Sequence, residues 1–301
     1  MELSIVMRLR IAAAMLTGAV ILGFIAWPLA AGVDPLGAVT LFTGQISILD
    51  GIILAVLAYI TGFAGYFAAY PCGRPLAPLA VPTGLAVWAF RSGNVESLIR
   101  TNRDLAEKQA VYRMFQFESI FWLGLVLIGY LGILTAEKLK STELPKEIAE
   151  AEVDTQKNRW LRIGMAIVAA AVISLFCIGI LAQDVRRFDA EINFVVGQPG
   201  TGQIAFAVIV AFGIAAFLSK LFLNVPPIVT TIASALIMII STQIYSNNHL
   251  LEHMSESWPI SFFPRAISAI LPLQIVAFAA IGSVTGYWLA IRYSYWRKHE
   301  Q

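Results

Sequence analysis

Long apolar runs constrain this chain more than any other feature. A helix needs about 20 mostly apolar residues to cross a hydrocarbon core of about 30 Å. The chain is 58% hydrophobic and 13% charged, whereas a soluble domain is about 45–50% apolar and about 25% charged. We therefore expect an all-α integral membrane protein. The predicted spans cover residues 11–31, 46–70, 76–90, 119–136, 161–182, 204–223, 226–246 and 266–291.

The distribution of basic residues decides how often the chain crosses. Cytoplasmic flanks of membrane proteins are enriched in Lys and Arg. With eight spans and both termini inside, 13 of the 21 basic residues lie on the inner side, whereas seven spans divide them 11 to 10. Eight spans are therefore favoured, although residues 91–118 then carry five basic residues outside. The predicted span 76–90 is the weakest of the eight because it is short. If this segment is re-entrant and does not cross the membrane, the chain has seven spans.

The two halves of the chain resemble each other. An ungapped alignment of residues 9–30 with 161–182 gives ten identities in 22 positions. After an insertion of six residues in the second half, Thr-Gly-Gln-Ile at 43–46 recurs at 201–204, and prolines open the next span in each half. Because four spans is an even number, two such repeats share one orientation in the membrane. We expect a first repeat at 1–136, a charged cytoplasmic linker at 137–160 and a second repeat at 161–301.

Residues 92–114 are too polar for a span but carry apolar residues at helical spacing. Asn94 is a candidate N-cap, since its side chain can accept a hydrogen bond from a free N–H. We expect an interfacial helix that runs into the fourth span. An ordinary solvated helix packed on neighbouring loops is the alternative.

The repeated tetrapeptide supplies a candidate polar site. Thr43 and Thr201 could each cap the helix that follows, which would make the motif a duplicated helix start. The functional alternative is a polar outer mouth, a ring of Thr43, Gln45, Thr201 and Gln203 formed where parallel repeats bring the two helix starts together.

A second candidate is His249-Leu250-Leu251-Glu252-His253, which spells H-x-x-E-H. Histidines four positions apart share a helix face, and a carboxylate one turn later completes a two-His, one-Glu metal set. The metal candidates are therefore His249, His253 and Glu256, with Glu252 as a base. The alternative is adventitious or structural use of the histidines, because nothing else in the chain resembles a metalloprotease. A divalent metal is the single cofactor suggested.

The remaining motifs exclude several functions. No phosphate-binding loop is present, and a net charge of +2 offers no polyanion-binding surface, so neither nucleotide nor nucleic acid is an expected partner. Ionisable residues within the spans, namely Asp50, Arg162 and Lys220, lie near span ends, which argues against a proton pump. The pair Gly282 and Gly286 predicts a close helix contact.

We therefore expect a multi-pass protein of the inner (plasma) membrane in contact with the lipid bilayer. It is either a transporter or channel for a small neutral or weakly charged solute, or a non-catalytic subunit of a larger membrane complex. Other membrane subunits or further copies of the chain are the candidate partners. A metal-dependent membrane enzyme is the rival class, but the sequence favours a protein that is not an enzyme and offers no catalytic residues for one.

Overall fold

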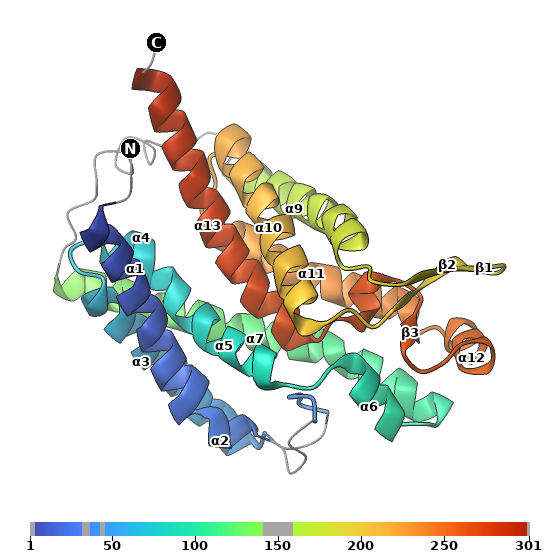
Figure 1. The fold of residues 1–301 in the computed structure, drawn as a ribbon. Coiled ribbons are helices and arrows are strands. Elements are labelled where there is room, and N and C mark those ends of the chain that lie inside the picture. Colours follow the sequence, from blue (N-terminus) through green and yellow to red (C-terminus); the bar gives the residue numbers. More distant parts are fainter. Residues whose placement is uncertain (1–3, 32–36, 43–45, 141–158, 300–301) are drawn as a thin grey trace.

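The computed structural model describes residues 4–31, 37–42, 46–140 and 159–299. Within these residues, seven helices are long and apolar enough to cross a bilayer. The chain is an α-helical, multi-pass membrane protein (Figure 1). The helices are α1 (Ile5–Gly18), η1 (Ala19–Ile25), α2 (Trp27–Ala30), α3 (Ile48–Ala68), α4 (Gly73–Leu76), η2 (Ala77–Leu79), α5 (Ala80–Arg91), α6 (Val95–Thr101), α7 (Leu105–Leu139), α9 (Arg159–Leu181), α10 (Thr201–Leu223), α11 (Pro227–Tyr245), α12 (Asn248–Ser257), η3 (Ala266–Ala269) and α13 (Pro272–His299). The strands are β1 (Arg186–Asp189), β2 (Asn193–Gly197) and β3 (Phe262–Phe263).

The weak segment 76–90 lies in a helical run of three pieces, α4, η2 and α5, which follow one another without a gap. The run is mostly buried against α1 and η1. Gly18 lies against the backbone of Ala80, and further along both helices the Trp88 Nε1 donates to the Gly23 carbonyl at 3.2 Å. These contacts advance in the same direction, so α5 runs parallel to α1. A parallel α5 fits eight spans, a count that stays a prediction.

Glycine brings two helices into backbone contact in each half. Gly62 of α3 lies against the carbonyl of Gly129 in α7, and Gly286 of α13 lies against the carbonyl of Gly213 in α10. A Cβ at Gly62 or Gly286 would collide with the main chain, so glycine is required for this close approach. The sequence predicts a close contact at Gly282 and Gly286, but it does not single out the equivalent contact of the first half.

The two halves of the chain contact each other through pairs of helices. In the first half α5 packs on α13 of the second, and α7 packs on α11 (Figure 1). In the predicted repeats, α5 and α11 hold the third position, whereas α7 and α13 hold the fourth. Each contact therefore joins a third helix to a fourth one. A two-fold relation about an axis along the membrane normal produces this pattern.

Two ionisable residues of the predicted spans support helix ends. Asp50 and Ser47 form a capping box at the start of α3, in which the Ser47 Oγ accepts from the Asp50 N–H at 3.1 Å. At the end of α10, the Lys220 Nζ donates to the Asn224 Oδ1 at 2.5 Å. Asn224 adopts φ 50°, the left-handed conformation that often terminates a helix. Both charges therefore satisfy groups at helix ends.

The interfacial helix expected at 92–114 is divided in two. Asn94 caps α6 as predicted, since its Oδ1 accepts from the Ser97 N–H at 2.9 Å. A break follows, and Asp104 forms a capping box with Glu107 at the start of α7. The 35-residue α7 then continues through the fourth predicted span.

A small antiparallel sheet lies at the end of the molecule opposite the start of α1 (Figure 1). Its strand order is β1-β2-β3, with Arg186 opposite Val196 and Val196 opposite Phe263. The hairpin of β1 and β2 projects from the bundle, and the short helix α12 lies on the same side (Figure 1). The predicted topology has outer loops in this region and no strands.

Candidate functional site: a cavity between the two halves

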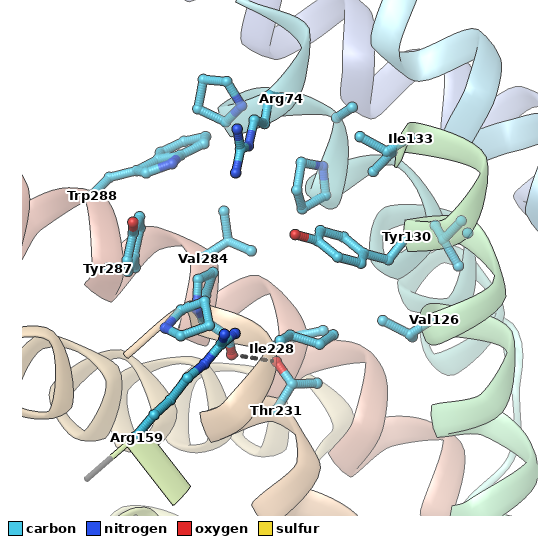
Figure 2. Close-up of a pocket in the computed structure, with 18 residues that line it drawn as sticks. Arg74, Val126, Tyr130, Ile133, Arg159, Ile228, Thr231, Val284, Tyr287 and Trp288 are labelled. Carbon is cyan, nitrogen blue, oxygen red and sulfur yellow. Dashed lines mark hydrogen bonds between the residues drawn. The ribbon is translucent and has the colours of Figure 1, made fainter. Parts of the chain in front are cut away.

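A cavity of about 240 Å³ lies between the two halves (Figure 2). The first half contributes α4, η2, α5 and α7, and the second contributes the starts of α9 and α11 together with α13. The charge distribution predicts that this end of the bundle is cytoplasmic. The lining residues are Arg74, Pro75, Ala77, Pro78, Val81, Val126, Gly129, Tyr130, Ile133, Arg159, Pro226, Pro227, Ile228, Thr231, Ala280, Val284, Tyr287 and Trp288.

Both halves contribute prolines to the cavity wall. Pro75 and Pro78 come from the α4–η2 run, and Pro226 and Pro227 precede and open α11. The predicted repeat places these two pairs at corresponding positions. Proline rings are apolar and have no N–H to donate, so this part of the wall offers contact surface rather than hydrogen-bond donors.

Two arginines extend toward the cavity from opposite walls (Figure 2). The Nη1 of Arg74 lies 3.2 Å from the Oε1 of Glu137, which is half-buried on α7. Arg159 is the first residue of α9 and is exposed. These two are the charged residues among those that line the cavity. Both of these lining charges are positive, which favours an anionic group in a ligand.

Aromatic side chains complete the cavity. Tyr287 and Trp288 extend from α13, and the hydroxyl of Tyr130 is directed into the space from α7 (Figure 2). The Thr231 hydroxyl donates to the Pro227 carbonyl at 3.1 Å, so it bonds within its own helix. The lining therefore combines aromatic and apolar walls with a cationic pair, which suits a small molecule with an apolar body and an anionic group.

The structure places the predicted metal candidates on α12. The Nδ1 of His249 lies 3.2 Å from the Oε1 of Glu191, and the Nδ1 of His253 lies 2.8 Å from the other oxygen of that carboxylate. Glu252 and Glu256 are exposed. The described part of the chain holds no group of three His, Cys, Asp or Glu side chains arranged for a metal ion. The metal-enzyme alternative stays a prediction, which metal analysis of the purified protein would test.

Asp189 anchors α12 to the hairpin. Burial of this carboxylate would by itself raise its pKa, but four hydrogen bonds outweigh burial and hold the pKa well below its usual 3.8. Its Oδ1 accepts from the N–H groups of Ile192 and Glu191, each at 2.8 Å. Its Oδ2 lies 2.6 Å from the Trp258 Nε1 and 2.9 Å from the His253 Nε2. Sequence reasoning missed Asp189, because its two side-chain partners, His253 and Trp258, lie more than 60 positions away.

The polar outer mouth can be judged only in part, since Thr43 and Gln45 lie outside the described residues. Thr201 does not cap α10: Gly200 holds the N-cap position and Thr201 is already helical. The Nε2 of Gln203 donates to the Leu181 carbonyl at 3.1 Å. The carbonyls at the end of a helix lack helical partners, so Gln203 supports the end of α9.

A buried carboxylate also escaped the sequence analysis, because Glu118 directly precedes the predicted span 119–136. It is 0% exposed, and its Oε2 accepts from the Thr40 hydroxyl at 2.8 Å. Its Oε1 accepts from the Trp122 Nε1 at 3.2 Å and the Leu41 N–H at 3.3 Å. Glu118 thereby joins α7 to the segment between α2 and α3.

No protein-family model matches the chain, and no curated protein or solved structure shows significant similarity to it.

Proposed function

We propose that this membrane protein is a transporter that binds a small, weakly anionic solute in the cavity between its two halves. The observation that carries the proposal is the position of Arg74 and Arg159, which line one cavity (Figure 2). Arg74 belongs to α4 of the first half, and Arg159 is the first residue of α9, at the point where the predicted linker meets the second half. Substrate sites in transporters with internal repeats lie where the repeats meet. Movement of one half against the other would change access to this cavity.

The helix contacts support a rocking motion. Within each half, glycine allows main-chain contact between two helices, at Gly62 in the first half and Gly286 in the second. Such contacts hold each half together as a unit. The cavity, in contrast, lies at the boundary between α4–α5 and α7 on one side and α11 and α13 on the other. Free space at this boundary leaves room for the halves to move.

The proposal includes a topology. It requires eight spans, two parallel four-span repeats, and both termini in the cytoplasm of a cell bounded by the inner membrane. Two observations support the repeat. α1 and α5 run parallel, and the third helix of each half packs on the fourth helix of the other half. The 13-to-8 division of basic residues supports the orientation.

Benzoate is a suitable probe, since it joins one carboxylate to a flat apolar ring. Its neutral analogue benzamide has the same shape without the charge. We expect benzoate to raise the unfolding temperature of the detergent-purified protein, and benzamide to have little effect. Arg159→Gln should abolish the benzoate effect, while the control Arg292→Gln, an exposed arginine outside the cavity, should retain it.

Uptake by proteoliposomes then tests movement. Radiolabelled benzoate should accumulate faster in vesicles containing the protein than in empty vesicles, and Arg159→Gln should remove the difference. Equal stabilisation by benzoate and benzamide, or an unchanged response in Arg159→Gln, would contradict an anion site in the cavity.

A non-catalytic subunit of a larger complex is the second candidate. Its support is the sequence pattern in which the charges of the predicted spans lie near their ends, and two of these, Asp50 and Lys220, serve helix termini. Purification of the native complex separates the two functions. Stoichiometric partner subunits would favour this candidate, whereas a lone chain or homo-oligomer would favour the transporter.

A further inference from the structure

A second hollow lies at the opposite end of the bundle, where α9 ends and the β1–β2 hairpin begins. It has a volume of about 530 Å³ and two chemically different parts. One part is apolar and consists of Leu175, Phe176, Gly179 and Ile180, which lie on one face of the last two turns of α9. We call this hollow the outer groove. Phe176 is 69% exposed, as expected of a side chain that faces lipid.

The other part of the outer groove is cationic. The guanidinium carbon of Arg186 lies 3.6 Å from the ring centroid of Phe194, and that of Arg265 lies 4.0 Å from the same centroid. Both arginines line the groove. Because both guanidinium groups stack on the Phe194 ring, two like charges lie in the same part of the groove, which favours an anion that contacts both.

The hydrogen bonding of this pair is incomplete. The Nη1 of Arg265 is buried and has no hydrogen-bond partner. Among the described residues, no carboxylate forms an ion pair with Arg186 or Arg265. The acidic residues of the hairpin, Asp189 and Glu191, contact the histidines of α12. Tyr245, which also lines the groove, interacts with the Arg265 guanidinium, and the remaining Nη1 donor favours a ligand that brings acceptor oxygens.

We propose that the outer groove binds an anionic phospholipid, with its phosphate held by Arg186 and Arg265 and an acyl chain along the α9 face around Gly179. The order of the two parts along the chain supports this ligand. The apolar face belongs to a predicted span, and the arginines belong to segments that follow or precede spans. Charged headgroup and acyl chain of a lipid are arranged in the same order across the membrane boundary. Arginine binds phosphate through directional, charge-assisted hydrogen bonds.

The groove offers two matched pairs of variants. A Cβ at Gly179 would meet nothing within 4 Å, so Gly179→Leu should fill the groove without disturbing the fold. Gly164 lies on the same helix with the same open surroundings but outside the groove, and Gly164→Leu is its control. For the cationic part, Arg187→Gln controls for Arg186→Gln, because successive residues of a strand point to opposite faces.

The test is native mass spectrometry of the full chain in detergent with added dioleoylphosphatidylglycerol or dioleoylphosphatidylcholine. We expect wild-type protein to bind the anionic lipid about tenfold more tightly than the zwitterionic one. The double variant Arg186→Gln/Arg265→Gln should lose this preference, and Gly179→Leu should weaken binding of the anionic lipid. Gly164→Leu and Arg187→Gln should behave as wild type, and the unfolding temperature of each variant checks its fold.

Three results would overturn the proposal. Equal binding of the two lipids by wild type would show that the arginines do not select a phosphate. Loss of binding in the arginine variant together with normal binding in Gly179→Leu would show that no acyl chain lies on α9. Displacement of the lipid by millimolar inorganic phosphate would identify a site for a small anion in place of a lipid.

Discussion

The Nε2 of His253 lies 2.9 Å from the Oδ2 of Asp189. This contact joins α12 to the end of β1, two segments separated by 64 positions in the chain. The second ring nitrogen of His253 faces Glu191, so the imidazole lies between two carboxylates. The cluster of Asp189, Glu191, His249 and His253 fixes the hairpin, which lies beside the outer groove, against α12.

The cluster predicts a strong effect of a change at Asp189. Asp189→Asn replaces a buried carboxylate that takes part in four hydrogen bonds with an amide. The amide oxygen can still accept hydrogen bonds, but the NH₂ group that replaces the second oxygen cannot. We expect a loss of about 2 kcal/mol in unfolding free energy, in the range for hydrogen bonds to a charged group. Asp184→Asn, at an exposed aspartate five positions earlier, should change stability little. Denaturant unfolding of the purified protein measures both, and equal effects would contradict the prediction.

The same carboxylate predicts a dependence on pH. Because its pKa is lower in the folded protein than the usual 3.8, its contribution is complete above that value and declines as the pH falls below it. The unfolding temperature of wild type should therefore fall more steeply between about pH 4 and pH 2 than that of Asp189→Asn. Parallel curves for the two proteins in this range would show that Asp189 does not contribute.

The apolar spans could be predicted from the sequence, because the bilayer fixes the length of a crossing helix. Seven helices of sufficient length confirm the multi-pass α-helical character. The limits of α7 were harder to predict. Its first 14 residues, 105–118, lie before the predicted span, yet the helix continues through them without interruption from the Asp104 capping box. Helix continuity depends on backbone hydrogen bonds, which hydropathy does not report.

The sites depend on contacts across long sequence separations, and this limited what the sequence could predict. Arg74 and Arg159 line one cavity although 85 positions separate them. The H-x-x-E-H spacing correctly placed His249 and His253 on one short helix. It could not predict that the carboxylate near them is Glu191 of the hairpin. Helical spacing predicts neighbours within one helix and has no information about a strand folded onto it.

The glycine contact between α10 and α13 predicts a stability difference. A Cβ at Gly286 would collide with the Gly213 carbonyl, so Gly286→Ala must separate the two helices. We expect a loss of about 1–3 kcal/mol, the usual cost of overpacking. At Gly124 of α7 a Cβ would meet nothing within 4 Å, so Gly124→Ala should be neutral or slightly stabilising. Unfolding in detergent compares the two variants, and similar values for both would contradict the close contact.

The buried carboxylate of α7 predicts a further loss. Glu118→Ala removes the acceptor of the Thr40 hydroxyl and the Trp122 N–H, and leaves both donors buried. We expect a cost of roughly 2–4 kcal/mol, since each unsatisfied buried donor costs about 1–3 kcal/mol. Arg113→Ala, at an exposed charge on the same helix, serves as the control. An unfolding free energy that is the same in both variants would exclude a structural role for Glu118.

The predicted topology places the hairpin turn outside the cell and the end of α7 inside it. The chain has two cysteines, Cys72 and Cys177, and both can be replaced by serine to give a background without thiols. Ala190 and Lys138 are exposed positions on the two sides, so a single cysteine at either should be reachable by water. In intact cells, a membrane-impermeant maleimide should label Ala190→Cys and leave Lys138→Cys unlabelled until the membrane is opened. The reverse pattern would invert the orientation derived from the basic residues. Labelling of both positions in intact cells would mean that they lie on one side, and an even number of crossings would separate Lys138 from the hairpin.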